Sequence, residues 1–311
     1  MSVWRFSLKK YIITGVTSFL GSNLAKCLIA DGNEVYGIVR PESKNTAAID
    51  SIEGLNVIRI DLDSYENDEL LCDAIKSSGV SGINGWIHFS WDGIGSEGRS
   101  NPEIQKRNII NAKKSYHAAK KLGAGRFVFS GSQAEYGNGT KDKPNPKSQY
   151  GIAKLEFGDW AKAQQTGMEF VHLRIYSVYG PGDHETSLVN SCVRTFLKKE
   201  DMILGPCSQL WNFMDIRDCS KAIAMIVERE ESTSGVFEIA SEHGKQLSEY
   251  VKDIWKICGE NGECLFGQRA NNAEGAADLV ADFTKLKEIG FSESYTFEEG
   301  VRNLIDFVSK K

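Results

Sequence analysis

The first half of this chain alternates short runs of β-forming residues with longer segments of helical periodicity. Strands and helices that alternate at this spacing indicate a parallel, doubly wound sheet, because two parallel strands need a crossover helix between them. We therefore predict an α/β fold. The predicted strands are residues 10–14, 34–39, 56–60, 85–90 and 126–130, and helices are predicted at 23–29, 65–77 and 102–122.

The first predicted strand ends in a glycine loop that leads directly into a helix. Gly15 would allow the tight turn, Gly21 would let the helix pack closely, and the helix N-terminus would offer N–H groups to a pyrophosphate. Ser18 stands where a middle glycine is expected, so its Cβ would displace the pyrophosphate and its hydroxyl could donate to it. An ordinary β–α turn is the alternative. The predicted cofactor contacts here are Thr14, Gly15, Thr17, Ser18, Phe19, Leu20 and Gly21.

The residues after the next two strands concern the adenosine half of a dinucleotide. A site selective for NAD usually has an acidic residue about 20 positions beyond the loop, where it binds the ribose 2′-hydroxyl. Arg40 has the opposite charge and, with Ser43 and Lys44, suits a 2′-phosphate. We therefore predict that NADP(H) is favoured over NAD(H); a surface arginine is the alternative. Asp61-Leu62 follows the third strand, where it would meet the adenine.

Tyr150 and Lys154 lie four residues apart in a segment of helical pattern, so they project from one helix face. A phenol ordinarily titrates near ~10, and a neighbouring ammonium favours the phenolate. Such a tyrosine can exchange a proton with a carbonyl oxygen while hydride moves at carbon. Ser132, at the end of the fifth strand, could hydrogen-bond the same oxygen. A Tyr/Lys pair alone is usually two surface residues; its position after the other motifs gives it weight.

Taken in order, these motifs resemble the extended short-chain dehydrogenase/reductases, of the NAD-dependent epimerase/dehydratase type that acts on nucleotide sugars. The resemblance implies a Rossmann-type domain with Tyr150 as acid/base, Lys154 on the nicotinamide ribose and Ser132 orienting the reacting oxygen. No metal site is predicted, because the five histidines are isolated and have no metal-ligand spacing. The matching segments are Thr14–Gly21, Asp61-Leu62, His88-Phe89-Ser90, Asn108, Ser132, Tyr150/Lys154 and Arg174–Gly182. The resemblance adds Phe89, Ser90, Asn108, Tyr176 and Val178 to the cofactor contacts.

Two departures from the family pattern narrow the reaction. Gln133 and Ala134 stand where the 4,6-dehydratases carry an Asp-Glu pair, so dehydration is disfavoured. Epimerisation and reduction at C4 remain, and Arg40 favours a reductase because a reductase must exchange spent cofactor for fresh, normally NADPH. We predict NADPH-dependent reduction of a nucleotide-linked 4-keto-6-deoxysugar. A nucleotide-sugar 4-epimerase is one alternative, and a non-catalytic dinucleotide-sensing protein is another.

The second half of the chain is expected to hold the nucleotide sugar. Trp211 stands where many UDP-sugar enzymes have an arginine, and the Gln209-x-Trp211 pattern resembles enzymes of CDP- or dTDP-linked deoxysugars. Arg194 and Lys198 are candidates for the diphosphate. A core tryptophan and an exposed helix face are the alternatives. The predicted substrate contacts are Trp91, Ser132, Gln133, Glu135, Ser177, Arg194 and Trp211.

Composition limits the remaining possibilities. The net charge of −5 includes no basic block, which disfavours nucleic acid, and no apolar run approaches the ~20 residues of a membrane span. Residues 1–6 lack the apolar run of a signal peptide, and the seven scattered cysteines suit reduced thiols, so we expect a cytoplasmic protein. A homodimer through the helices of Tyr150 and Asn108 is implied by the family. The predicted domains are 1–175 plus about 213–240 for the dinucleotide, and 176–212 plus 241–311 for the substrate.

Overall fold

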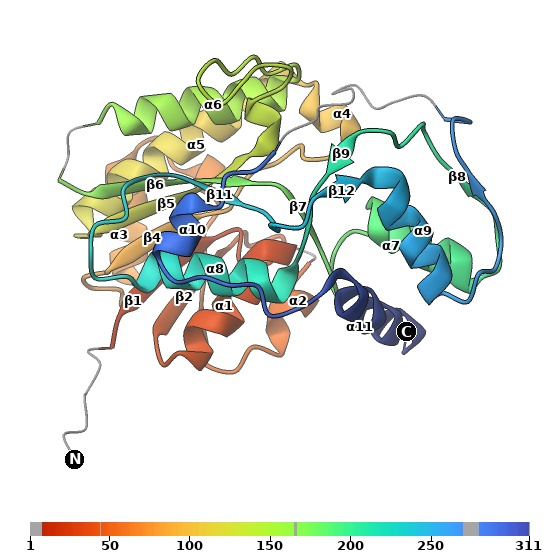
Figure 1. Ribbon diagram of the computed structural model, residues 1–311. Coiled ribbons are helices and arrows are strands. Elements are labelled where there is room, and N and C mark those ends of the chain that lie inside the picture. Colours follow the sequence, from red (N-terminus) through yellow and green to blue (C-terminus); the bar gives the residue numbers. More distant parts are fainter. Residues whose placement is uncertain (1–7, 44, 165–166, 270–279, 311) are drawn as a thin grey trace.

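A computed structural model of the chain describes residues 8–43, 45–164, 167–269 and 280–310. Within these residues, seven parallel strands form one sheet in the order β11-β6-β5-β4-β1-β2-β3 (Figure 1). The order reverses between β1 and β4, which places a crevice above the carboxyl ends of these strands. The predicted doubly wound sheet is confirmed. The strands are β1 (Lys10–Thr14), β2 (Glu34–Val39), β3 (Leu55–Arg59), β4 (Gly85–His88), β5 (Arg126–Ser132), β6 (Glu169–Ile175) and β11 (Gly235–Ile239).

Helices cover both faces of this sheet, which explains why its strands are apolar almost throughout. Successive side chains point to opposite faces: Ile12 packs in one core cluster, whereas Tyr11 and Ile13 pack in the other. The first cluster lies beneath α3 (Asp68–Ser77), α5 (Pro102–Lys121) and α6 (Gln149–Lys162). The second lies beneath α1 (Phe19–Ala30), α2 (Ala47–Asp50), α8 (Ile216–Glu228) and α10 (Thr284–Glu288).

A smaller lobe with its own core stands beside the carboxyl edge of the sheet (Figure 1). Its buried apolar residues come mainly from three amphipathic helices, α7 (Leu188–Leu197), α9 (Leu247–Ile257) and α11 (Phe297–Ser309). Short strand pairs tie the connecting segments together. These pairs are β7 (Ser177–Tyr179) with β10 (Phe213–Asp215), β8 (Met202–Ile203) with β13 (Cys264–Leu265), and β9 (Leu210–Trp211) with β12 (Lys245–Gln246).

The chain crosses between the two parts more often than the sequence indicates. Leu286 and Phe291, from a segment expected in the lobe, pack in the core beneath the sheet. Beyond the lobe segments, β11 returns to the nucleotide-binding sheet and extends it by pairing with β6. All seven cysteines are free thiols. In the described part of the chain, no helix combines the length and apolarity needed to cross a membrane.

Candidate active site

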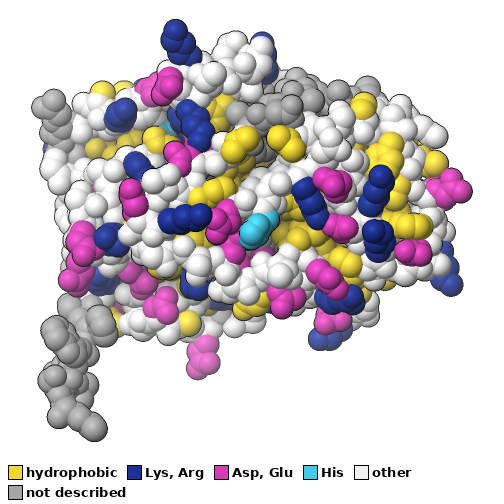
Figure 2. All heavy atoms as spheres, viewed as in Figure 1, with side chains coloured by type: hydrophobic (Ala, Val, Ile, Leu, Met, Phe, Trp, Pro, Cys, Tyr) yellow, Lys and Arg dark blue, Asp and Glu magenta, His cyan; other side chains and the backbone are white. Residues whose placement is uncertain are grey.

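A cleft of about 1930 Å³ runs along the carboxyl edge of the sheet and continues against the smaller lobe. Its wall contains residues from the ends of β1, β2, β4 and β5, from α6, and from the lobe segments around β7, β8 and β9. Figure 2 shows apolar side chains reaching the surface over the middle and the lobe, with charges of both signs scattered over the rest of this face. The cleft is large enough for a dinucleotide and a second ligand.

The glycine loop has the geometry that a dinucleotide needs. Gly15 has a φ of 70°, and a Cβ there would lie 2.8 Å from the backbone of Phe89 and Ser90. A Cβ at Gly21 would collide with the Gly15 carbonyl oxygen, so α1 can approach the loop only because this residue is glycine. The first turn of α1 contains no acidic residue, and Thr17, Ser18, Phe19 and Leu20 line the cleft. An anionic pyrophosphate fits this helix N-terminus.

Ser18 has a structural role that its place in the motif does not show. It is the N-cap of α1, and its Oγ accepts a hydrogen bond of 3.1 Å from the Gly21 N–H. Because the hydroxyl accepts this bond, its own hydrogen still points elsewhere and can be donated to a phosphate. The serine therefore stabilises the helix end that receives the pyrophosphate.

Thr14 does not line the cleft; its side chain links the end of β1 to the end of β4. Its hydroxyl is 3.0 Å from Nδ1 of His88 and accepts a hydrogen bond of 3.3 Å from the Ser90 N–H. Burial, with a smaller contribution from the Lys154 charge, lowers the pKa of His88 to about 3. His88 is therefore neutral at ordinary pH and serves as a structural part of the β4 end.

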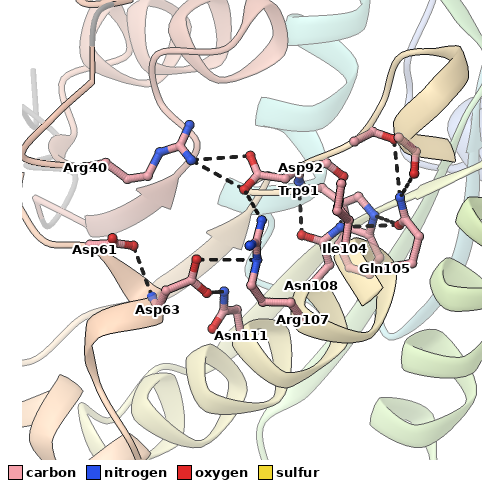
Figure 3. A network of polar contacts seen from close by, with 12 residues as sticks. Arg40, Asp61, Asp63, Trp91, Asp92, Ile104, Gln105, Arg107, Asn108 and Asn111 are labelled. Atoms are coloured by element: carbon pink, nitrogen blue, oxygen red, sulfur yellow. Dashed lines mark hydrogen bonds and ion pairs between the residues drawn. The ribbon is translucent and has the colours of Figure 1, made fainter. Parts of the chain in front are cut away.

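At the adenosine end, four charged side chains from the ends of β2, β3 and β4 and from α5 form a network (Figure 3). Asp92 lies 3.4 Å from Arg40 and 3.2 Å from Arg107, and Arg107 also lies 3.4 Å from Asp63. Arg40 and Asp92 are both well exposed, so this pair contributes little to stability. Arg40 therefore lies at the cleft in a weak ion pair that a bound ligand could replace. Asp61, Leu62 and Ser43 also line this end, while the predicted Lys44 lies outside the described residues.

Asn108 holds the segment that follows β4. Its amide accepts a 3.0 Å hydrogen bond from the Asp92 N–H and donates a 2.9 Å bond to the Asp92 carbonyl. Gln105, one turn earlier on α5, accepts from the Trp91 indole N–H at 2.8 Å. These buried amides keep Trp91 and Asp92 in the cleft wall, beside Phe89 and Ser90.

Tyr150 and Lys154 both face the cleft from the first turns of α6. Lys154 Nζ lies 5.6 Å from the centroid of the Tyr150 ring and 3.9 Å from that of Trp91, and it donates to the Ser130 carbonyl. Burial places the pKa of this lysine well below its ordinary value, and the nearby Arg99 charge lowers it further. The predicted pair is thus brought together, with its cation in a dry site.

Ser132 and Gln133 line the same cleft as this pair, but Glu135 does not. The Glu135 side chain is fully buried and accepts from the Ser132 N–H at 2.8 Å, from Arg174 at 2.8 Å and from His172, whose Nε2 is 2.9 Å away. Burial alone would raise the pKa of Glu135, but His172 and Arg174 hold it below its ordinary value. Its carboxylate holds the serine loop in place, so Glu135 does not lie where the predicted substrate contact would require it.

We expect Glu135→Ala to lower the free energy of unfolding by about 3–5 kcal/mol, because it leaves the buried Arg174 without its carboxylate. Glu135→Gln should cost less, since its amide oxygen can still accept one of these bonds. Urea denaturation measures both. Glu298→Ala removes an exposed carboxylate 2.7 Å from Arg302 and should change stability by under about 0.5 kcal/mol. Equal losses for Glu135→Ala and Glu298→Ala would contradict this assignment.

At the lobe end of the cleft, Trp211 donates from its indole nitrogen to Ser177 Oγ at 3.0 Å, and both line the wall with Tyr176 and Val178. Arg194 lies outside the wall and pairs with Glu185 at 2.8 Å. Sequence motifs missed the charged wall residues Asp92, Arg99 and Arg269. Asp92 and Arg269 lie in connecting segments, and Arg99 ends a helix of only four residues, so periodicity carries no signal at any of them.

Comparison with known proteins agrees with this geometry. The model of the NAD dependent epimerase/dehydratase family matches residues 11–240. The chain belongs to this family. It is therefore an enzyme of the extended short-chain dehydrogenase/reductase kind, and its family is NAD-dependent. The chain is also 23% identical over 302 residues to a CDP-abequose synthase of Salmonella muenchen, covering 96% of this chain and 97% of that one.

Solved structures of the same fold are also similar to this chain. A UDP-N-acetylglucosamine 4-epimerase from Methanobrevibacter ruminantium, in complex with UDP-N-acetylmuramic acid, superposes with a TM-score of 0.84 at 22% identity, covering 98% of this chain and 100% of that one. A Thermus thermophilus UDP-glucose 4-epimerase in complex with NAD gives 0.82 at 20% identity, covering 96% and 99%. At this identity the likeness establishes the fold of the chain.

Proposed function

We propose that this enzyme uses NADPH to reduce C4 of a 4-keto-6-deoxysugar linked to CDP or dTDP. The observation that carries the proposal is the placement of Tyr150, Lys154 and Ser132 on one cleft that also contains the glycine loop and Arg40. Trp211 lines its lobe end at the sequence position where many UDP-sugar enzymes have an arginine, which suits a nucleotide other than uridine diphosphate. The similarity to a protein named for a CDP-linked sugar supports the same choice.

The side chains of the cleft have distinct roles in this reduction. Bound NADPH would supply a hydride to C4 and become NADP⁺. Tyr150 donates its phenolic proton to the carbonyl oxygen, which becomes the new hydroxyl, and the phenolate later regains a proton from solvent. Ser132 hydrogen-bonds the same oxygen and orients the carbonyl. Lys154 binds the nicotinamide ribose and favours the phenolate. Lys154 Nζ lies 3.9 Å from the centroid of the Trp91 ring and 4.8 Å from that of Phe129. These two rings keep water away from the ammonium group.

The preference for NADPH rests on Arg40. A 2′-phosphate can displace Asp92 from Arg40, because an exposed ion pair at 3.4 Å is weak and a charge-assisted bond to phosphate is stronger. We expect Arg40→Asp to weaken NADPH binding at least about tenfold and NADH binding less than about threefold. Titration of each cofactor by fluorescence or calorimetry measures both constants.

The control for this prediction is Arg59→Asp, which makes the same charge change at the exposed end of β3, outside the cleft wall. It should alter the two dissociation constants little and equally. If Arg40→Asp weakened both cofactors by one common factor, Arg40 would have no part in choosing between them.

The principal alternative is a nucleotide-sugar 4-epimerase, which the epimerases among its structural neighbours favour. An epimerase returns the hydride to the sugar, so its cofactor is not consumed. A non-catalytic dinucleotide sensor would not need the Tyr150/Lys154 pair. These alternatives predict different outcomes in one assay.

The assay mixes the enzyme with NADPH and a CDP- or dTDP-linked 4-keto-6-deoxysugar and follows the reduced-nicotinamide absorbance. Stoichiometric loss of NADPH, with a product two mass units heavier, supports reduction. Interconversion of two sugar nucleotides without net loss of NADPH would establish the epimerase, and the absence of turnover with both classes would support the sensor.

We also propose that two copies associate through α5 and α6. Ile110 on α5 and Ile152 on α6 leave 49% and 39% of their surface exposed, and these are the two helices that the family resemblance implicates. We further propose that the dinucleotide part is built around the two core clusters of the sheet and the substrate part around the core of the lobe, with residues 284–291 assigned to the sheet.

A further inference from the structure

The catalytic tyrosine has a second cation beside it that no motif predicted. Arg99 ends the short helix α4 (Ser96–Arg99), which follows β4 and packs against α6. Its guanidinium carbon lies 4.2 Å from the centroid of the Tyr150 ring, closer than the 5.6 Å of Lys154 Nζ. Both cations line the cleft. Tyr150 is thus approached from two different elements.

These two cations differ in how reliably they hold a positive charge. Lys154 is 2% exposed, and an ammonium loses its proton readily in a dry site. Arg99 is half-buried, and a planar guanidinium keeps its positive charge in proteins more reliably than an ammonium does. A guanidinium over an aromatic face is also attracted by the ring quadrupole. Arg99 therefore provides a positive charge next to the phenol even when Lys154 is neutral.

Charged groups on the elements around Tyr150 contact partners of their own. Glu135, on the 3-10 turn η2 (Gln133–Glu135), is bound by Arg174 and His172. Asp92, after β4, is bound by Arg40 and Arg107. On α5, which also packs against α6, Lys113 lies over the Trp160 ring at 5.1 Å, near the far end of α6. Of the charges in the described residues around Tyr150, Arg99 and Lys154 contact its ring.

We propose that Arg99 is a positioning residue that holds the Tyr150 ring against the cleft and stabilises its phenolate. This role rests on the proposed function, in which Tyr150 gives a proton to the carbonyl and stands as phenolate after each turnover. Loss of the cation makes the phenolate less favourable, so the tyrosine stays protonated to higher pH. In the direction of reduction, the rate falls at high pH where the tyrosine has lost its proton, and this limb should move upward.

The test uses Arg99→Met, which keeps the length of the side chain without its charge, and Arg99→Lys, which keeps a charge. Lys106→Met is the matched control, because Lys106 is an exposed cation on α5 outside the cleft wall. For each variant, kcat/KM for the keto sugar is measured from pH 6 to 10, and we expect Arg99→Met to move the descending limb up by about 1 pH unit. Arg99→Lys should move it less, and Lys106→Met should leave it in place.

A second readout needs no substrate. The chain has ten tyrosines. The phenolate absorbance of the whole protein is therefore titrated with and without the additional change Tyr150→Phe, and the difference between the two curves is the titration of Tyr150 alone. We expect the Tyr150 midpoint to rise by about 1 pH unit in Arg99→Met. If the midpoint rises but no nucleotide sugar is turned over, the role of Arg99 stands and the proposed function fails. An unchanged midpoint and limb in an active Arg99→Met enzyme would overturn the role.

Discussion

Tyr150→Phe is expected to lower kcat for the keto sugar by about 10³-fold, the usual loss when a general acid is removed. The phenylalanine ring fills the same space beside Arg99 and Lys154, but it has no proton to give to the carbonyl oxygen. The affinity for NADPH should change by less than about threefold, because the hydroxyl adds at most one hydrogen bond to the cofactor. Steady-state kinetics and cofactor titration on the same preparation separate the two effects.

Tyr65→Phe is the matched control, since Tyr65 packs against the sheet core and lies outside the cleft wall. It should keep turnover within about twofold, as expected for a tyrosine that touches neither ligand. A Tyr150→Phe enzyme that retained full turnover with an identified substrate would show that another group protonates the carbonyl, and the assigned mechanism would be wrong. A raised KM with kcat unchanged would instead make Tyr150 a binding residue.

The sheet could be predicted from the sequence because each strand and helix shows its own pattern of apolar residues within a short segment. The central strands are mostly apolar runs buried on both faces, and each helix repeats its apolar residues with a different period. The two-residue strands β8, β9, β12 and β13 were not predictable in this way. Their pairs join distant segments, such as Lys245 with Trp211, and two residues are too few to show a period.

In the candidate site too, residues in motifs of fixed spacing could be predicted from the sequence, whereas residues placed by long-range contacts could not. Gly15, Tyr150 and Lys154 belong to motifs with fixed spacing, and the structure places all three on the cleft. Glu135 could not be placed in this way. Its position close to Ser132 in the sequence suggested a substrate contact, but in the structure its buried carboxylate accepts a hydrogen bond from Arg174. That contact joins residues 39 positions apart, so only the assembled fold could reveal it.

Lys154→Met is expected to abolish turnover while making the protein without ligands more stable. The activity loss, at least about 10²-fold in kcat, follows from removing the cation that favours the phenolate and binds the ribose. The gain, about 1 kcal/mol in the free energy of unfolding, follows because methionine fills the same dry site without a charge to desolvate. The donor lost to the Ser130 carbonyl offsets part of this gain.

The pH dependence of this gain identifies its cause. Burial lowers the pKa of Lys154, so between that value and the lysine's ordinary value near ~10.4 the unfolded chain binds more protons than the folded one. The stability of the wild type therefore rises with pH across this window, and the advantage of Lys154→Met should shrink as the pH approaches ~10. Lys162→Met, an exposed lysine in the last turn of the same helix, should be slightly destabilising instead, because it loses a favourable charge at the helix C-terminus. If Lys154→Met were also destabilising at neutral pH, the lysine would be a net structural contributor, and the view that the fold tolerates a costly buried cation for the sake of catalysis would have to be abandoned.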